Sequence, residues 1–275
     1  MDLSGRVAVI TGAGSGIGRG LAIALAREGM NLVLAGCNDE PLANTAEVVS
    51  DLGAECLCVV ADVSQLGDVR RIADRALERF EGVHLLCNNA GVGPLGTVAE
   101  TSVEEWRWVL SVNLWGPIHG VHVFLPLMER QGIGHICTTA SESGLYGTPF
   151  LGAYNVSKFG VVGLMQSLAR DLKASGSPVT ASVFCPSGTK TNIMDSTRNQ
   201  PPEVRAAHTE SDATKAFKGM VGQVVKDGLD PNDSAKIVVA SIRRDQFWIF
   251  SHPHVPETAL RQARAMAENN ALIDL

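Results

Sequence analysis

Tyr154 and Lys158, four residues apart, are well suited to acid–base chemistry. If the segment after Pro149 is helical, the two side chains project from one face, one turn apart. A free tyrosine has a pKa of about 10, and a neighbouring ammonium group lowers that value by favouring the phenolate. Tyr154 could then give a proton to a carbonyl oxygen or take one from an alcohol. Ser141, thirteen residues upstream of Tyr154, could hold the same oxygen. The alternative is an ordinary helical turn with a solvated lysine.

A glycine-rich turn, T-G-A-G-S-G-I-G over residues 11–18, follows the first predicted strand. A turn between a strand and a helix N-terminus offers free N–H groups to phosphates, and glycines let the backbone approach a pyrophosphate closely. The spacing is G-x-x-x-G-x-G, from Gly12, Gly16 and Gly18. It matches neither the G-x-G-x-x-G dinucleotide fingerprint nor a P-loop. The alternative is a tight turn that binds no ligand.

Short β-rich runs alternate with longer helical patterns, which predicts an α/β fold with a doubly wound parallel sheet. The predicted strands cover residues 6–11, 31–35, 56–60, 83–87, 133–139, 179–185 and 247–250. The predicted helices cover residues 17–29, 40–52, 65–80, 103–130, 150–173, 233–243 and 255–269. We expect Pro117 and Pro126 to make the long fourth helix irregular.

The regular pattern lapses between residues 186 and 232, a polar stretch with Pro201-Pro202 and a single aromatic residue, Phe217. The stretch is too long for an ordinary loop, so we expect a substrate-binding flap at about 188–225 with some helix of its own. Neither a linker nor an internal repeat is visible. We therefore predict a single domain over residues 1–275.

Composition narrows the class of protein. Of the 275 residues 45% are hydrophobic and 19% charged, which is enough apolar material for a core, and the net charge of −6 argues against nucleic acid or an anionic membrane as partner. No apolar run is long enough for a transmembrane helix, and no signal-peptide pattern is visible. The six cysteines form no C-x-x-C pair, so we expect reduced thiols and a cytoplasmic protein. His119 and His122 could share a helix face, but no third ligand is suggested, so no metal site is expected.

The motifs together resemble those of the classical short-chain dehydrogenases/reductases, over nearly the whole chain. They are the glycine turn, Asp62-Val63, the N-N-A-G of residues 88–91, Asn113 in N-L-W-G, Ser141, the Y-N-V-S-K of residues 154–158 and the P-S-G-T-K-T of residues 186–191. Each motif is weak alone, but their order and spacing are those of the family. The resemblance implies a Rossmann-type fold and a nicotinamide cofactor at the carboxyl ends of the strands.

The resemblance also implies a role for individual residues. Tyr154 corresponds to the catalytic acid/base, Ser141 to the residue that orients the substrate oxygen, and Lys158 to the residue that binds the nicotinamide ribose and lowers the tyrosine pKa. Asn113 corresponds to the residue that holds a proton-relay water. The expected cofactor-binding residues, besides Tyr154 and Lys158, are Gly12, Ser15, Gly16, Ile17, Gly18, Gly36, Cys37, Asn38, Asp62, Val63, Asn89, Ala90, Gly91, Pro186, Ser187, Thr189 and Thr191.

Two departures from the family pattern bear on the cofactor. Ser187 stands where the family has glycine, so the backbone there loses glycine's freedom. Gly36 stands where members that prefer NAD carry an acid for the ribose 2′-hydroxyl. Gly36 removes a carboxylate that would repel a 2′-phosphate, and Asn38 could donate to that phosphate. We therefore expect NADP(H) to be favoured, with NAD(H) as the alternative.

The implied reaction is reversible hydride transfer between the nicotinamide and a small-molecule ketone or secondary alcohol. Leu95, Leu145, Tyr146 and Phe150, with Ile193 and Met194, suggest an apolar site for a bulky aromatic or cyclic substrate. Resemblance also suggests a homotetramer or homodimer. Epimerases and dehydratases share the Tyr/Lys pair but usually carry a G-x-x-G-x-x-G turn. The alternative outside enzymes is a non-catalytic, nucleotide-sensing regulator on the same fold, a class that tends to lose the four residues retained here.

Overall fold

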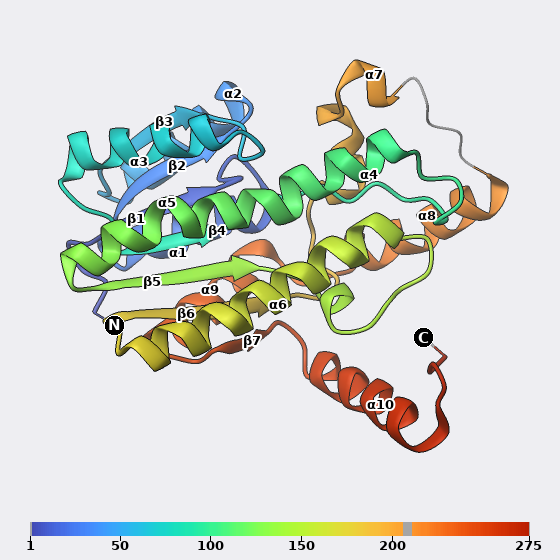
Figure 1. Ribbon diagram of the computed structural model, residues 1–275. Coiled ribbons are helices and arrows are strands. Elements are labelled where there is room, and N and C mark those ends of the chain that lie inside the picture. The colour runs from blue at the N-terminus through green and yellow to red at the C-terminus, as the bar shows by residue number, and fades with distance from the viewer. Residues whose placement is uncertain (1, 206–210, 275) are drawn as a thin grey trace.

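Seven parallel strands form one sheet in the order β3-β2-β1-β4-β5-β6-β7 (Figure 1). The computed structural model describes residues 2–205 and 211–274. The strands are β1 (Val7–Thr11), β2 (Asn31–Gly36), β3 (Cys56–Val60), β4 (Leu85–Asn88), β5 (Gly134–Thr139), β6 (Val179–Cys185) and β7 (Trp248–Phe250). The predicted parallel sheet is therefore confirmed.

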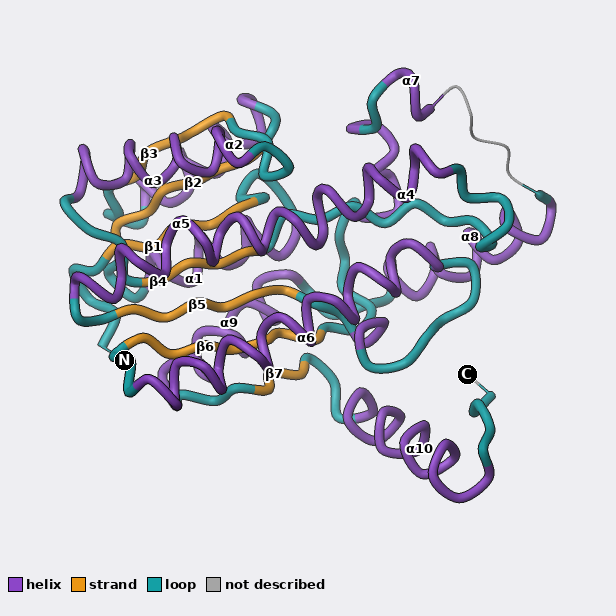
Figure 2. Tube along the Cα trace, in the orientation of Figure 1, coloured by secondary structure: helices purple, strands orange, loops and turns teal. Residues whose placement is uncertain are grey.

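Helices cover both faces of the sheet, because successive strand residues point to opposite sides and both sides are apolar. In β1, Val7 and Val9 enter one buried cluster, while Ala8 and Ile10 enter the other. The first cluster is closed by α3 (Leu66–Phe80), α5 (Gly116–Gln131) and α6 (Gly152–Ser175). The second is closed by α1 (Gly16–Arg27), α2 (Asp39–Asp51) and α9 (Pro231–Arg243). The result is a three-layer α/β/α arrangement (Figure 2).

The strand order reverses between β1 and β4, and this is where an open parallel sheet forms its ligand crevice. The loops that follow the two strands are tied together there. The Thr11 hydroxyl accepts hydrogen bonds from the backbone N–H groups of Asn89 (2.9 Å) and Ala90 (3.1 Å). The Asn89 amide donates to the Thr11 carbonyl at 3.1 Å. The glycine turn and the N-N-A-G motif therefore form one edge of the crevice.

The expected continuous helix over residues 103–130 was wrong in one respect. It consists of α4 (Val103–Leu110), a π-helical turn (Ser111–Trp115) and α5, and the irregularity precedes Pro117, which occupies the first turn of α5. Pro126 lies inside α5 without ending it. The π-helical turn contains Asn113, and such turns occur frequently at functional sites. It lets α4 extend beyond the carboxyl ends of the strands while α5 packs on the sheet (Figure 1).

The expected flap contains a 3₁₀ helix (Ile193–Asn199), α7 (Pro202–Arg205) and α8 (Asp212–Lys226), and residues 206–210 lie outside the described part of the chain. α8 lies beside the start of α6, where Phe217 stacks on Phe150 with ring centroids 4.7 Å apart. After β7, α10 (His254–Asn269) projects away from the sheet (Figure 1). Within the described residues, no helix combines the length and apolarity needed to cross a membrane.

Candidate active site

A cavity of about 570 Å³ lies along the carboxyl ends of the strands and contains most of the residues expected to bind cofactor and substrate. The expected residues that line it are Gly12, Ser15, Gly16, Ile17, Gly36, Cys37, Asn38, Asp62, Val63, Asn89, Ala90, Gly91, Ser141, Tyr154, Lys158, Pro186, Ser187, Thr189 and Thr191. Gly18 and Asn113 do not line the cavity, but each packs against residues that do.

The glycine turn leaves no room for side chains at its tightest points. Gly12 has a φ of +67°, and a Cβ there would lie 2.9 Å from Ala90 Cα. A Cβ on Gly18 would lie 2.1 Å from the Gly12 carbonyl oxygen, so this glycine shapes the turn from inside. α1 begins directly at Gly16, and the Ser15 side chain makes no capping hydrogen bond to it. This bare helix N-terminus fits a pyrophosphate group.

The end of β2 forms the adenosine end of the expected cofactor site. A Cβ on Gly36 would meet only Leu42, at 3.5 Å, so the missing side chain leaves open space and no carboxylate. The Asn38 amide donates to the Asn199 side-chain oxygen at 3.2 Å. The flap therefore reaches this end of the cavity, and Arg198, next to Asn199, also lines the cavity while its guanidinium donates to the Asn192 and Asp195 carbonyls. Sequence reasoning missed Arg198 and Asn199, because only the folded flap brings them to β2.

Asp62 and Val63 follow β3 and are held in place by local contacts. The Asp62 carboxylate accepts a hydrogen bond from the Ser64 N–H at 2.9 Å, and the backbone N–H of Asp62 donates to the Asp68 carboxylate at 2.8 Å. The Val63 carbonyl oxygen lies 2.9 Å from Nδ1 of His119. His119 thus has a structural partner, and across the described residues no group of three or more His, Cys, Asp or Glu side chains is placed to hold a metal.

Ser141, Tyr154 and Lys158 lie together at the centre of the cavity. Ser141 follows β5 and caps a 3₁₀ turn (Glu142–Gly144), while Tyr154 and Lys158 lie in the first turns of α6. The Lys158 ammonium donates to the Thr139 carbonyl at 2.9 Å and lies 5.5 Å from the centre of the Tyr154 ring. A Cβ on Gly144 would lie 2.6 Å from the Lys158 carbonyl oxygen, so glycine allows the serine loop to pack against α6.

Burial dominates the electrostatics of this group. It raises the pKa of Tyr154 to about 12, with a smaller lowering by a hydrogen bond from Ser141 and a smaller raising by the Glu142 charge. This direction is opposite to the one expected from Lys158. Burial also lowers the pKa of Lys158 to about 8. At neutral pH Tyr154 therefore carries its proton, and Lys158 is still mainly cationic.

Asn113 lies fully buried behind Gly91 and Lys158. Its side-chain oxygen accepts from the Val92 N–H at 2.8 Å, and its amide donates to the Val92 carbonyl at 2.8 Å and to Ser157 Oγ at 3.2 Å. Both amide hydrogens are therefore engaged. A relay water could approach only the remaining lone pair of the side-chain oxygen or the backbone of the π-helical turn. The side chain fixes the strand-end segment that follows the N-N-A-G motif.

The 186–191 segment crosses the glycine turn. A Cβ on Gly16 would lie 2.9 Å from Thr191 Cγ2, and the Thr189 hydroxyl donates to the Ser187 carbonyl at 3.1 Å. Ser187 is not among the residues with positive φ, so its backbone conformation does not require glycine. The Ser187 N–H donates to Ser251 Oγ at 3.0 Å, and its side chain donates to Glu142 at 2.9 Å.

The end of the cavity expected to hold the substrate is mostly apolar, with Glu142 as a charged exception, but its lining differs from the one expected. Ile193 and Met194 line it, whereas Leu95, Leu145, Tyr146 and Phe150 do not. Tyr146 is buried against Glu142, and the half-buried Phe150 stacks on Phe217. The remaining apolar lining comes from Trp108, Val112, Leu151, Val221, Val224 and Val225. Helical spacing could not assign the α8 valines to the site, because their position depends on how the flap folds back.

Two carboxylates hold the flap over the cavity. Glu100 accepts hydrogen bonds from the Thr214 hydroxyl (2.8 Å) and the Ser211 N–H (3.2 Å), both at the start of α8. Hydrogen bonds lower the pKa of Glu100 to about 2, and the bond from Ser211 makes the largest contribution. The buried Glu105 accepts from the Gln200 amide at 3.5 Å. In addition, the Gly93 N–H donates to Ser196 Oγ at 2.9 Å.

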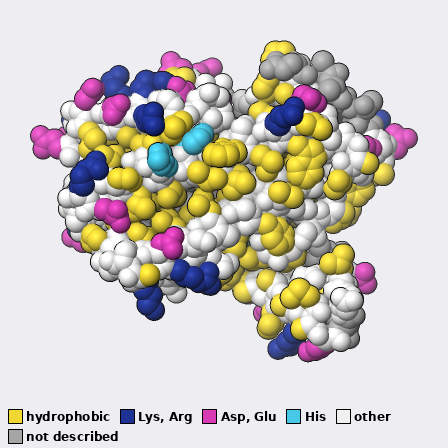
Figure 3. All heavy atoms as spheres, viewed as in Figure 1, with side chains coloured by type: hydrophobic (Ala, Val, Ile, Leu, Met, Phe, Trp, Pro, Cys, Tyr) yellow, Lys and Arg dark blue, Asp and Glu magenta, His cyan; other side chains and the backbone are white. Residues whose placement is uncertain are grey.

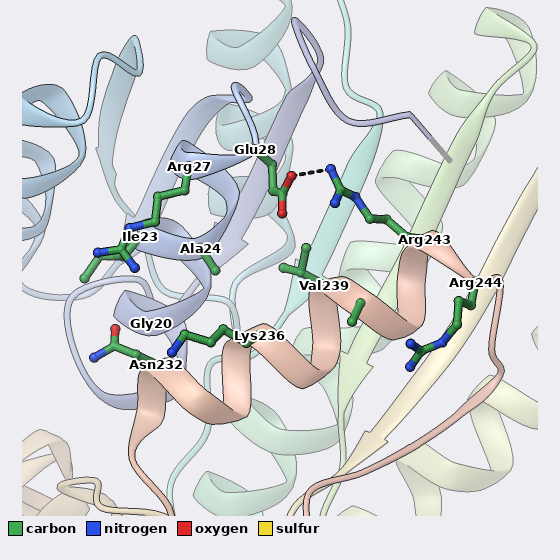
Figure 4. Close-up of a pocket in the computed structure, with 11 residues that line it drawn as sticks. Gly20, Ile23, Ala24, Arg27, Glu28, Asn232, Lys236, Val239, Arg243 and Arg244 are labelled. Carbon is green, nitrogen blue, oxygen red and sulfur yellow. Dashed lines mark hydrogen bonds and ion pairs between the residues drawn. The ribbon is translucent and has the colours of Figure 1, made fainter.

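A second cavity, of about 370 Å³, lies between α1 and α9 and contains none of these catalytic candidates (Figure 4). Ile23, Ala24 and Val239 form its apolar floor. Arg243 pairs with Glu28 across its rim. The groups able to bind a nucleotide and transfer a proton therefore lie in the first cavity.

A doubly wound sheet, a glycine turn at its switch point and a Ser/Tyr/Lys group in the adjoining cavity define the class of dinucleotide-binding oxidoreductases. The short chain dehydrogenase family model matches residues 6–202. The chain belongs to this family and is an oxidoreductase.

Individual relatives are similar over most of the chain. A short chain dehydrogenase/reductase from Burkholderia phymatum, solved in complex with NAD, is 39% identical, with a TM-score of 0.97 over 100% of this chain and 99% of the other. An alcohol dehydrogenase from Thermococcus sibiricus, solved with 5-hydroxy-NADP, is 26% identical, with a TM-score of 0.72 over 89% and 95%. The CLA biosynthesis dehydrogenase/reductase of Lactiplantibacillus plantarum is 29% identical over 92% of this chain and 90% of the relative.

Proposed function

We propose that this protein catalyses reversible hydride transfer between a nicotinamide cofactor and a bulky, apolar ketone or secondary alcohol, with Tyr154 as the general acid/base. The observation that carries the proposal is the placement of Ser141, Tyr154 and Lys158 in one cavity with the glycine turn and the strand-end loops. The bound cofactor supplies the hydride chemistry. The protein contributes orientation, charge placement and exclusion of water.

In the proposed mechanism Ser141 and Tyr154 hold the carbonyl oxygen, and Tyr154 donates its proton to it. The raised pKa of Tyr154, about 12, keeps the phenol protonated at neutral pH, the state that reduction requires. Lys158 would hold the nicotinamide ribose and, with the water expected at Asn113, would return a proton to Tyr154 after Tyr154 has donated its own. Asn113 keeps the segment after β4 in place through its two bonds to Val92. In the oxidation direction the phenolate would have to form, which burial disfavours.

The substrate is proposed to be an aromatic or cyclic small molecule. The cavity's substrate end combines Trp108, Leu151 and valines of α8. Glu142 contributes a carboxylate to the same lining. That charge disfavours an anionic substrate near the reacting oxygen.

For the cofactor we propose a preference for NADP(H), with NAD(H) as the alternative. The absence of a carboxylate at Gly36, the Asn38 amide and the nearby Arg198 support this preference, because all three tolerate or favour a 2′-phosphate. The two solved relatives described above were complexed with NAD and with an NADP derivative, so they support the cofactor class without separating the two.

We further propose that the chain acts as one domain, as a homotetramer or homodimer in the cytoplasm. A wide apolar surface over the face that carries α5 and α6 supports the oligomer (Figure 3). The six unpaired cysteines, of which Cys87, Cys137 and Cys185 are buried, are in keeping with a reducing compartment.

The test is the absorbance of the reduced nicotinamide, followed with NADP(H) and NAD(H) in parallel against bulky cyclic and aromatic ketones and alcohols. Wild-type protein should turn over with a preference for NADP(H). Tyr154→Phe should still bind the cofactor and lose about 10²–10⁴-fold in kcat, as for the loss of a general acid. Substantial turnover by Tyr154→Phe would refute the assigned role. Clear cofactor binding without turnover by wild type would leave two explanations, a substrate outside the panel or the nucleotide-sensing regulator.

A further inference from the structure

Three side chains from distant parts of the chain meet beside the loop that carries Ser141. Glu142 follows Ser141, Ser187 lies in the segment expected to cover the nicotinamide, and His254 begins α10. The Ser187 hydroxyl donates to Glu142 Oε1 at 2.9 Å. His254 Nε2 lies 3.2 Å from Ser187 Oγ and 3.5 Å from Glu142 Oε2. A single carboxylate thus connects the serine loop, the 186–191 segment and the C-terminal helix.

The bonds of this cluster are directionally consistent. Glu142 accepts from Ser187 through one oxygen and from the Tyr146 hydroxyl through the other, at 2.8 Å. Ser187 can donate to Glu142 and accept from His254 Nε2–H at the same time, because a hydroxyl does both. The backbone strengthens the same connection, since the Glu142 N–H donates to the Pro186 carbonyl at 2.9 Å. Hydrogen bonds to a charged group are stronger than those between neutral groups.

Ser187 is the residue that joins these elements. Its N–H donates to Ser251 Oγ at 3.0 Å, and Ser251 Oγ lies 2.7 Å from Nδ1 of His252. The side chain at position 187 therefore links the segment to both Glu142 and the residues that lead into α10. A glycine there would keep the backbone bond and lose the hydroxyl bridge.

α10 has few other connections to the body of the molecule, from which it projects (Figure 1). Val255 is fully buried beside His254, and Thr258, one turn along, bonds the Tyr146 hydroxyl. The helix thus meets the body of the molecule at the Glu142 cluster.

We propose that Glu142 is a positioning residue which, through Ser187 and His254, fixes the Ser141 loop and the 186–191 segment in the arrangement needed for hydride transfer. The inference rests on the proposed function and adds residues that do not themselves touch the reacting atoms. Its two consequences are a properly placed serine hydroxyl and an ordered cover over the nicotinamide. The Glu142 charge also acts on Tyr154, whose pKa it raises.

The test uses the full-length protein with Glu142→Gln, Ser187→Gly and His254→Ala, singly and in pairs. Cofactor affinity is measured by titrating reduced nicotinamide fluorescence, and kcat and KM are measured with one active ketone. We expect Ser187→Gly and Glu142→Gln each to lower kcat roughly tenfold and to weaken cofactor binding severalfold, with substrate KM little changed. Each double variant should be no worse than its worse single variant, because one cluster is being broken.

Two matched variants separate positioning from general damage. Ser187→Thr keeps the hydroxyl and should restore most of the kcat that Ser187→Gly loses. Glu257→Gln removes an exposed carboxylate from the same turn of α10 and should leave both readouts unchanged. In the reduction direction, Glu142→Gln should also move the alkaline limit of kcat to lower pH, because the charge that raises the Tyr154 pKa is gone.

The inference would be overturned if the losses of the single variants simply added in the double variants. It would also be overturned if the single variants kept cofactor affinity and kcat within twofold of wild type. If wild type binds cofactor but turns over no carbonyl compound, the proposed function fails, and the non-additivity of the cofactor affinities then decides the inference alone. Thermal unfolding of each variant identifies any loss that comes from misfolding, and Ser187→Thr then serves as the deciding variant.

Discussion

Burial, rather than the neighbouring ammonium group, sets the protonation of Tyr154. The pKa of the phenol rises to about 12 and that of Lys158 falls to about 8, because each charged form is poorly solvated inside the cavity. Lys158 directs its ammonium to the Thr139 carbonyl instead of the phenol oxygen. At neutral pH the pair is therefore a protonated phenol beside an ammonium group that gives up its proton more readily than usual, which suits proton donation to a carbonyl.

His135 offers a residue-level prediction about stability that is independent of the site. It lies in β5 and its ring is buried beside β6, with Nδ1 2.7 Å from Thr180 Oγ1 and Nε2 2.7 Å from Ser182 Oγ. Burial lowers its pKa to about 4. Since an unfolded histidine has a pKa of about 6.5, the unfolded chain binds more protons between these two values, and stability falls as the pH drops through that window. The loss should be on the order of 3 kcal/mol.

Urea unfolding of wild type and His135→Gln between pH 7 and pH 4 measures this contribution. The variant should be less stable at pH 7, because it fits the two hydroxyls poorly, and its unfolding free energy should depend less on pH. His122→Gln, on the exposed side of α5, should retain the wild-type pH dependence. Equal pH dependence in wild type and His135→Gln would show that His135 is not kept neutral by the fold.

At the level of elements, periodicity predicted the sheet and its helices well, because a strand buried on both faces reads as a continuous apolar run. The π-helical turn at residues 111–115 was not predictable in this way. Its position is set by the packing of α4 and α5 on either side, and by Asn113 reaching Val92, a contact between separate elements. The prolines pointed to the right helix but to the wrong residue within it.

Close packing between α1 and α9 depends on a glycine in α1. Gly20 lies against α9, where a Cβ would come within 2.5 Å of the Pro231 carbonyl oxygen (Figure 4). Backbone cannot yield as a flexible side chain can, so Gly20→Ala should separate the helices and lower the unfolding free energy by about 1–3 kcal/mol. Gly67→Ala, in the first turn of α3 with nothing within 4 Å, should leave stability unchanged or slightly higher. Urea unfolding of both variants checks this, and an equally stable Gly20→Ala would contradict it.

For the molecule as a whole, the motifs that directly follow a strand, such as the glycine turn and the 186–191 segment, indicated which strand ends line the cavity. The adenosine end and the substrate end were less predictable. Asn38 meets Asn199, and Phe150 meets Phe217, only because the flap folds back over the cavity. These pairs are separated by 161 and 67 positions in sequence, and neither residue type signals its partner. The hydrophobic periodicity of a segment reports its local structure, and it does not indicate where a polar segment such as the flap packs on the rest of the chain.

The outer face of α4–α6 leads to the prediction about assembly. α6 packs closely along the π-helical turn, where a Cβ on Gly160 would lie 2.9 Å from Leu114. The residues next to this contact, Trp115 and Phe159, are 53% and 45% exposed, and Val156 is 49% exposed. Hydrophobic side chains gather on this face (Figure 3), and a contiguous apolar surface of this kind marks an interface. We expect copies of the chain to associate through it.

Light scattering coupled to size-exclusion chromatography measures the assembly directly. Wild type should have a mass at least twice the 29.1 kDa of the chain, and Trp115→Glu combined with Phe159→Glu should reduce that mass by half or more. The charges would be buried without partners in the interface, which costs more than the association gains. Trp248→Glu, at the exposed edge strand β7, is the matched control. If that variant dissociates the assembly and the double variant does not, then the edge of the sheet, and not the face of α4–α6, joins the subunits.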